Sequence, residues 1–142
     1  DASTRLLKGP TRPLIPQDER AETLSALAMV DYVTVFDEPT ASETLAALRP
    51  DVYVKGGDYA TANPDVPARD YLVGPDELRR LVAGEAPEDA TLAALAGLVE
   101  RLPEARTVAE YGGSLALLAY LPGHSTTELI QRIVSRFASE SP

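Results

Sequence analysis

The hydrophobic residues of this chain follow two patterns, continuous apolar runs and repeats at helical spacing. The continuous runs are residues 32–36, 52–54 and 114–121, and the first is rich in β-branched and aromatic side chains. Such runs predict strands with both faces buried, as in a parallel sheet. Repeats at helical spacing predict helices, which we place at residues 17–29, 40–49, 76–83, 88–102 and 125–137.

The order of these segments indicates the fold class. Strands that alternate with helices imply right-handed crossovers and a parallel sheet covered by helices on both faces. We therefore expect an α/β protein with a Rossmann-like parallel sheet and flanking helices, and its length suits a single domain over residues 1–142. Residues 60–110 differ from the rest because they are rich in proline, alanine and acidic residues. We expect them to form a peripheral helical insertion without a chemical role.

The composition argues against several kinds of site. The chain of 142 residues has no cysteine and one histidine, His124, so disulfides and metal sites built from these residues are not expected. The formal net charge of −9 disfavours a nucleic-acid-binding surface. No apolar run reaches membrane-spanning length and no signal peptide is recognisable. We therefore expect a soluble cytoplasmic protein that binds neither nucleic acid nor membranes.

The first candidate site lies in residues 121–128, where a strand end runs directly into a helix. Ser125 is a good N-cap residue, and Glu128 three residues later completes a capping box. The free N–H groups and positive dipole of such a helix start, with the hydroxyls of Thr126 and Thr127, suit a phosphate group. The alternative is an ordinary capped helix without a ligand.

The second candidate site follows the strand at residues 52–54. Two glycines just past a strand end allow the backbone to approach a ligand closely, and ligands of open α/β sheets bind at the carboxyl ends of strands. The flanking side chains offer a positive charge, a carboxylate acceptor and a flat ring. The alternative is a plain turn. The residues concerned are Lys55, Gly56, Gly57, Asp58 and Tyr59.

The third candidate site is the start of the chain. Residues 1–16 carry a glycine and three prolines, so we expect a loop. In this loop Lys8, Arg12 and the peptide groups around Gly9 could wrap an anion, and a solvated basic loop is the alternative. Arg20 lies among acidic residues of the next helix, where a surface ion pair is the simplest interpretation.

Several stretches together resemble one known family. In chain order they are Asp1-Ala2-Ser3, Leu7-Lys8-Gly9-Pro10-Thr11-Arg12-Pro13-Leu14, Glu19-Arg20, Val30-Asp31-Tyr32-Val33, Leu48-Arg49-Pro50-Asp51, Val54-Lys55-Gly56-Gly57-Asp58-Tyr59, Tyr111-Gly112-Gly113 and Pro122-Gly123-His124-Ser125-Thr126-Thr127. As an ordered set they resemble the cytidylyltransferase-like nucleotidyltransferase superfamily. The most similar branch is the adenylyltransferase domain of bacterial ADP-heptose synthases. The resemblance covers residues 1–59 and 110–136.

This resemblance implies transfer of a nucleotidyl group from a nucleoside triphosphate, ATP with Mg²⁺, to a sugar phosphate such as heptose 1-phosphate, with release of pyrophosphate. Such chemistry needs positioning and charge neutralisation more than covalent help. By position, Lys8 and Arg12 would be catalytic and close over the phosphates, and Arg20 would orient that loop or the triphosphate. The remaining nucleotide-binding residues would be Lys55, which like Lys8 supplies mobile positive charge, Gly56, Gly57, Asp58 and Tyr59 around base and ribose, and Gly123, His124, Ser125, Thr126 and Thr127 around the β and γ phosphates.

Two departures from the family pattern bear on the function. Cytidylyltransferases carry an arginine where this chain has Tyr120, which favours the heptose branch over the glycerol-phosphate branch. The family's His-x-Gly-His motif is absent from the chain and would belong upstream of Asp1, so His124 is not the family's catalytic histidine. In the family strand order 3-2-1-4-5, this chain would supply strands 3, 4 and 5, with the first two missing. Strand 3 would then have no neighbour.

These departures leave three expectations for function. The first is adenylyl transfer to heptose 1-phosphate by a longer protein, in which this chain is the C-terminal part of a nucleotidyltransferase domain and lacks activity by itself. The second is cytidylyl transfer to a polyol phosphate. The third is a nucleotide-binding module without catalysis. A homodimer or a fusion to an upstream domain is possible in each case.

Overall fold

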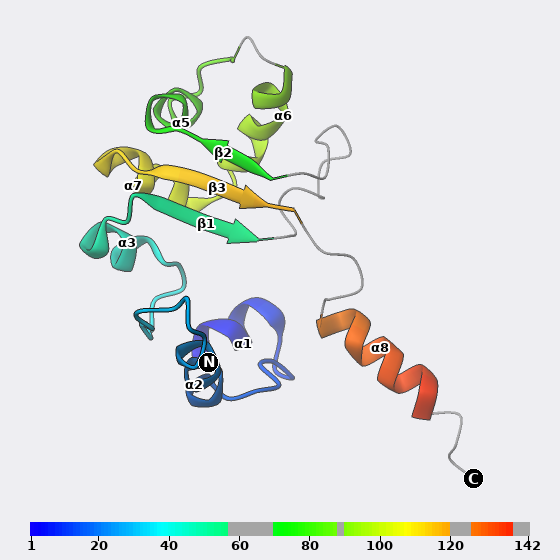
Figure 1. The fold of residues 1–142 in the computed structure, drawn as a ribbon. Helices are drawn as coiled ribbons and strands as arrows, with labels where there is room; N and C mark the ends of the chain where they lie inside the picture. Colours follow the sequence, from blue (N-terminus) through cyan, green and yellow to red (C-terminus); the bar gives the residue numbers. More distant parts are fainter. Residues whose placement is uncertain (57–69, 88–89, 120–125, 138–142) are drawn as a thin grey trace. The chain divides into compact units, whose positions relative to one another are not determined.

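The computed structural model describes residues 1–56, 70–87, 90–119 and 126–137 (Figure 1). The chain separates into two compact units, residues 1–48 and residues 49–142. Each unit is described by itself below. The single domain expected over residues 1–142 stays a prediction.

The first unit begins with a helix that the sequence analysis had assigned to a loop. Helix α1 spans Ala2–Lys8 and ends at Gly9, whose φ of 90° suits glycine and whose N–H bonds to the Arg5 carbonyl. The prediction of a loop was wrong for these residues. They contain no glycine or proline, and the prolines that suggested a loop all follow Gly9.

Two further helices of the first unit confirm the predicted segments with shorter bounds. Helix α2 spans Gln17–Ser25, and the chain continues as turns to Met29. The Ser25 hydroxyl donates to the Glu22 carbonyl at 2.8 Å, which is the kind of local bond that competes with helix continuation. Helix α3 spans Ser42–Leu48.

The strand predicted at residues 32–36 is not formed. These residues have no regular secondary structure, and the Tyr32 side chain is 92% exposed. A strand is stable only when its backbone N–H and C=O groups pair with a neighbour, and no strand in the described residues pairs with this segment. The β propensity of the segment is therefore not sufficient by itself.

The second unit contains a three-stranded sheet with the order β1-β3-β2. Strand β1 (Val52–Gly56) pairs in parallel with β3 (Ser114–Leu118), which confirms two of the predicted strands as neighbours. Strand β2 (Tyr71–Val73) pairs antiparallel with the other edge of β3 and was not predicted. The sheet is therefore mixed, and the expectation of a purely parallel sheet was wrong.

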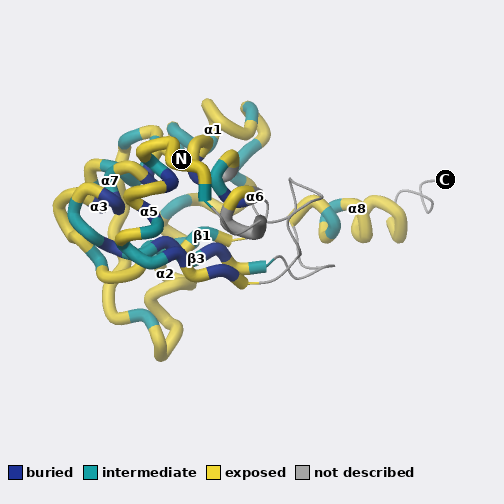
Figure 2. The backbone as a smooth tube through the Cα atoms, turned by 90° about the horizontal axis from the view of Figure 1, so that it is seen from above, coloured by how far each residue is buried: buried dark blue, intermediate teal, exposed yellow. Residues whose placement is uncertain are grey.

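Three helices of the second unit complete its core. The predicted helices are present as α5 (Pro75–Val82) and α6 (Ala90–Val99), and α7 (Pro103–Tyr111) is additional. Helices α5 and α7 pack against β3 (Figure 1). The buried apolar residues, dark blue in Figure 2, include Val73, Leu78, Leu81, Leu95, Val99, Leu102, Val108, Leu115 and Leu117. Most of these lie in residues 60–110, so the expectation that this stretch is peripheral was wrong.

The opposite face of the sheet is exposed. Val52, Val54, Leu72 and Leu118 alternate with buried or half-buried residues along their strands and keep 44–69% of their surface accessible. The prediction of a sheet covered on both faces therefore holds for one face only among the described residues.

The last helix, α8, spans Thr126–Phe137 and confirms the predicted C-terminal helix from its second residue onward. Ser125, the predicted N-cap, lies outside the described residues. The apolar positions of α8 fall at helical spacing as predicted, and they are exposed rather than buried: Leu129, Ile133, Val134 and Phe137. None of the helices in the described residues has the length and apolar character that crossing a bilayer requires.

Candidate nucleotide site

The carboxyl ends of β1 and β3 lie side by side at one edge of the sheet. The register places Gly56, the last residue of β1, opposite Leu118, the last residue of β3. The two segments predicted to bind nucleotide therefore leave the sheet from neighbouring positions. The predicted site residues Gly57, Asp58, Tyr59, Gly123, His124 and Ser125 lie outside the described residues.

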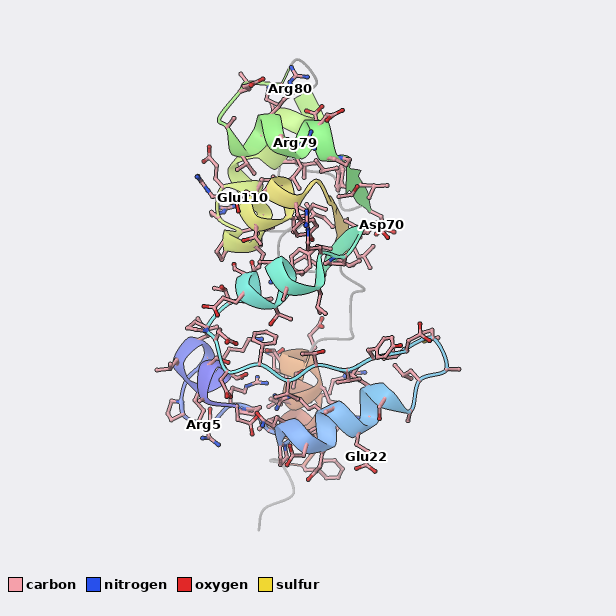
Figure 3. All side chains as sticks on the ribbon, turned by 90° about the vertical axis from the view of Figure 1, so that its left-hand side faces the viewer. Arg5, Glu22, Asp70, Arg79, Arg80 and Glu110 are labelled. Carbon is pink, nitrogen blue, oxygen red and sulfur yellow. The ribbon has the colours of Figure 1, made fainter. Side chains whose placement is uncertain are left out.

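Asp70 contributes a contact at this edge that the sequence analysis missed (Figure 3). Its Oδ1 accepts a hydrogen bond of 2.7 Å from the Ala119 N–H, immediately after β3. Tyr71, the next residue, lies opposite Leu117 in the antiparallel pair. Asp70 thus ties the residue before β2 to the residue after β3. A lone aspartate before a three-residue strand offers no pattern that would have identified it.

Lys55 is held on the covered face of β1. Its ammonium lies 3.6 Å from the Glu104 carboxylate of α7 and donates a hydrogen bond of 3.1 Å to the Tyr53 hydroxyl. The side chains of Lys55 and Glu104 are 26% and 6% exposed. The mobile positive charge expected of Lys55 is therefore engaged in an ion pair here, and its role in nucleotide binding stays a prediction. Glu104 was not singled out from the sequence because Lys55 becomes its neighbour only when α7 packs on the sheet.

Tyr111 is the last residue of α7 and precedes the start of β3 by three residues. The guanidinium carbon of Arg49 lies 5.9 Å from the centroid of the Tyr111 ring, a distance suited to a cation–π contact. Within the described part of the chain, the Tyr111 hydroxyl is buried and has no hydrogen-bond partner. Burial raises the pKa of this phenol above its ordinary value of 10.0. The Arg49 charge opposes that effect, whereas Asp51 and Tyr53 add to it.

In the first unit, Arg20 links the start of the chain to α2. Its Nη1 lies 2.9 Å from the Asp1 carboxylate and also donates to the Ile15 carbonyl. The other Asp1 oxygen accepts the N–H of Gln17, the first residue of α2, at 3.2 Å. A carboxylate at this position stabilises the positive end of the helix dipole. Arg20 therefore forms an ion pair, but its partner is Asp1 rather than one of the acidic residues of α2 that the sequence suggested. Its orienting role stays a prediction.

A cavity of about 210 Å³ in the first unit adjoins this ion pair. Its lining combines the polar side chains near Asp1 with the apolar segment that does not form a strand. The lining residues are Asp1, Ser3, Thr4, Gln17, Arg20, Ala21, Leu24, Val33, Thr34, Val35 and Phe36.

Lys8 and Arg12 flank a turn rather than an open loop. Lys8 is the exposed last residue of α1, where its charge is favourable for the negative end of the helix dipole. The Gly9 N–H bonds to the Arg5 carbonyl, and the Arg12 N–H bonds to the Gly9 carbonyl at 3.1 Å. These two peptide N–H groups are used within the chain, so the expectation that peptide groups around Gly9 wrap an anion was wrong for them.

Thr126 and Thr127 are the first two residues of α8, and both are exposed. The N–H groups of a first helical turn have no partner within the helix, so this position keeps the donors that a phosphate requires. Among the described residues, no group of three or more acidic or histidine side chains could hold a metal ion. The expected Mg²⁺, which would arrive with ATP, stays a prediction, as does phosphate binding at α8.

Comparison with known proteins identifies relatives of this chain. The chain is 40% identical over 137 residues to the bifunctional protein HldE of Syntrophotalea carbinolica. It is 38% identical over 140 residues to that of Geobacter sulfurreducens and 39% identical over 132 residues to that of Streptomyces coelicolor. The chain is therefore similar to one part of bifunctional HldE proteins. The resemblance to ADP-heptose synthases inferred from the sequence is thereby confirmed.

The matches cover nearly all of this chain but a small part of each relative. They include 96%, 99% and 93% of the chain, and 20%, 21% and 20% of the three HldE proteins. The chain therefore spans about a fifth of the length of the curated relatives it matches. No protein-family model matches the chain, and no solved structure matches it.

Proposed function

We propose that this chain serves nucleotidyl transfer within an HldE-type protein, with ATP as the donor and heptose 1-phosphate as the acceptor. The observation that carries the proposal is the parallel pairing of β1 with β3, which brings Gly56 and Leu118 together at one edge. Ligands of open α/β sheets bind outside the carboxyl ends of such strands. In the sequence, residues 57–59 follow directly after Gly56, and the segment that starts at Pro122 follows four residues after Leu118.

In the proposed reaction, a phosphate oxygen of the acceptor attacks the α-phosphorus of ATP. The bond from the α-phosphorus to the bridging oxygen breaks, and pyrophosphate leaves. Gly56 and the three residues after it would face base and ribose, and the start of α8 with Thr126 and Thr127 would hold the β and γ phosphates. Lys8 and Arg12 would neutralise charge that develops in the transition state, and Arg20 would orient their turn. Mg²⁺ bound with ATP would neutralise further phosphate charge.

A second function is a nucleotide-binding module without turnover. It is favoured by one observation, the absence of a His-x-Gly-His motif from the 142 residues. Cytidylyl transfer to a polyol phosphate is the remaining alternative, and Tyr120 in place of the cytidylyltransferase arginine disfavours it.

The test measures pyrophosphate release by the full-length protein with magnesium and each pairing of ATP or CTP with heptose 1-phosphate or glycerol 3-phosphate. We expect turnover of about 1 s⁻¹ or more with ATP and heptose 1-phosphate, and at least about tenfold less with the other pairings. Faster turnover with CTP and glycerol 3-phosphate would reassign the activity. ATP binding without turnover in any pairing would favour the binding module.

A further inference from the structure

The ion pair between Lys55 and Glu104 is the most enclosed pair of opposite charges among the described residues. The Glu104 side chain is 6% exposed, and its Oε1 lies 3.6 Å from the Lys55 ammonium. The same ammonium donates to the Tyr53 hydroxyl at 3.1 Å and lies 5.7 Å from the centroid of that ring. Lys55 is thus surrounded by groups that suit a cation, and its charge is already balanced.

The register of the sheet explains why Lys55 has this environment. Side chains alternate between the two faces of a strand, so Tyr53 and Lys55 share one face of β1. They lie opposite Leu115 and Leu117, which are buried. This is the face on which Glu104 reaches Lys55 from α7. The side chain of Lys55 therefore runs between the sheet and α7, although its backbone precedes Gly56 at the carboxyl end.

It is energetically unfavourable for the Lys55 ammonium to leave the Glu104 carboxylate and bind a phosphate instead. Such a transfer would take the Lys55 ammonium away from the buried Glu104 carboxylate. Loss of one partner from a buried pair costs about a hundredfold or more in an equilibrium constant. A hydrogen bond between a cation and a phosphate is worth about ten- to a hundredfold. Moving the ammonium to the phosphate would therefore not lower the free energy, and the ion pair should persist when a nucleotide binds.

We propose that Lys55 and Glu104 are positioning residues of the nucleotide site and that neither contacts the nucleotide. Their ion pair, supported by Tyr53, ties the end of β1 to α7. It thereby holds Gly56, the last residue of β1, in the position proposed to receive the base and ribose. This inference rests on the proposed function, and it assigns to Lys55 a different role from the mobile charge expected from the sequence.

A double-mutant cycle in the full-length protein tests the proposal. Lys55→Met and Glu104→Met each keep about the same side-chain length and remove one charge of the ion pair. The double variant removes both charges. Replacement of a buried ion pair by apolar side chains of similar volume is often neutral for stability. In the double variant the two methionine side chains would pack together between β1 and α7 and replace the ion pair. We therefore expect ATP affinity, measured by calorimetry with magnesium, to fall about tenfold in each single variant and to return to within about threefold of wild type in the double variant.

Two outcomes of the titration would overturn the proposal. If Lys55→Met and the double variant bind ATP weakly while Glu104→Met binds like wild type, Lys55 contacts the nucleotide directly. If both single variants bind ATP like wild type and lose only thermal stability, the ion pair supports the fold alone. Thermal unfolding of each variant establishes that it is folded at the titration temperature.

Hydrogen exchange without nucleotide separates this proposal from the proposed function. The amides of Lys55 and Gly56 should exchange at least about tenfold faster in each single variant and recover protection in the double variant. A wild-type protein that does not bind ATP would remove the proposed function, and unchanged exchange in the single variants would remove the positioning pair. Arg80→Met with Glu85→Met is the control, because this 3.2 Å ion pair of the α5 region is exposed. It should change neither measurement.

Discussion

At the scale of single residues, Tyr111 carries a buried hydroxyl that makes no hydrogen bond within the described residues. Burying such a group without a partner costs about 1–3 kcal/mol. We expect Tyr111→Phe to keep the ring beside Arg49 and to raise the free energy of unfolding at pH 7 by about 1 kcal/mol. Urea unfolding measures this change. Tyr32→Phe, which removes an exposed hydroxyl, is the control, and a destabilised Tyr111→Phe variant would contradict the prediction.

The same phenol gives a pH dependence. Because its folded-state pKa is raised above 10.0, the folded protein retains the phenolic proton at a pH where the unfolded chain loses it. The proton-linked part of the free energy of unfolding is therefore at its maximum below about pH 10, and it is lost as the pH rises through the folded-state pKa. We expect the wild-type free energy of unfolding to decline more steeply than that of Tyr111→Phe between pH 9 and pH 11. Parallel declines would show that this phenol is not linked to folding.

Gly113 is required by a close approach of the chain to itself. A Cβ atom built at this position would lie 2.5 Å from Cε2 of Tyr111 and 3.1 Å from the Pro50 carbonyl oxygen. We expect Gly113→Ala to destabilise the protein by about 1–3 kcal/mol, the usual cost of overpacking. Gly97→Ala is the matched control. Gly97 lies within α6, and a Cβ atom built there has no other atom within 4 Å. This variant should stabilise by about 0.5–1 kcal/mol. Equal effects in thermal unfolding would contradict this account.

At the scale of elements, the helices and strands that follow from local sequence patterns were predicted. Helices α2, α3, α5, α6 and α8 follow from helical spacing, and β1 and β3 follow from continuous apolar runs. Strand β2 was missed because three residues are too few for a pattern, and it exists only by pairing with β3. Helix α7 was missed although Pro103 begins it and Gly112, with φ 83°, follows it. Those two residues are recognised helix boundaries and could have revealed it.

The start of α8 is the element whose predicted role is most directly testable. A triphosphate at this helix start would accept bonds from unpaired N–H groups and from the Thr126 hydroxyl. We expect Thr126→Ala or Lys8→Ala in the full-length protein to weaken ATP binding by about 1–3 kcal/mol. Ser135→Ala removes a hydroxyl near the other end of α8, where it bonds to the Arg132 carbonyl at 3.1 Å, and it should leave the affinity unchanged. Calorimetric titration that finds wild-type affinity in both Thr126→Ala and Lys8→Ala would leave α8 as an ordinary helix.

At the scale of the whole molecule, contacts between residues far apart in the sequence could not be predicted from local patterns. The residues around Gly56 were recognised from an unbroken motif, whereas Asp70 and Glu104 were not. Asp70 bonds to a residue 49 positions later, and Glu104 meets Lys55 only after α7 packs on the sheet. The failure of residues 32–36 to form a strand has the same origin, because propensity cannot supply a neighbour.

The exposed sheet face and the missing motif lead to the last prediction. Strand β1 pairs on one edge only among the described residues, and Val52 and Val54 on its open face remain accessible. The chain also has no His-x-Gly-His motif, which the family resemblance makes part of catalysis. We therefore expect the 142-residue chain by itself to release no measurable pyrophosphate from ATP and heptose 1-phosphate, under conditions in which the full-length protein turns over at about 1 s⁻¹ or more. Isotopically labelled ATP and a coupled pyrophosphate assay measure both proteins side by side. Turnover by the isolated chain at the full-length rate would mean that its own residues, such as Lys8 and Arg12, suffice for the chemistry.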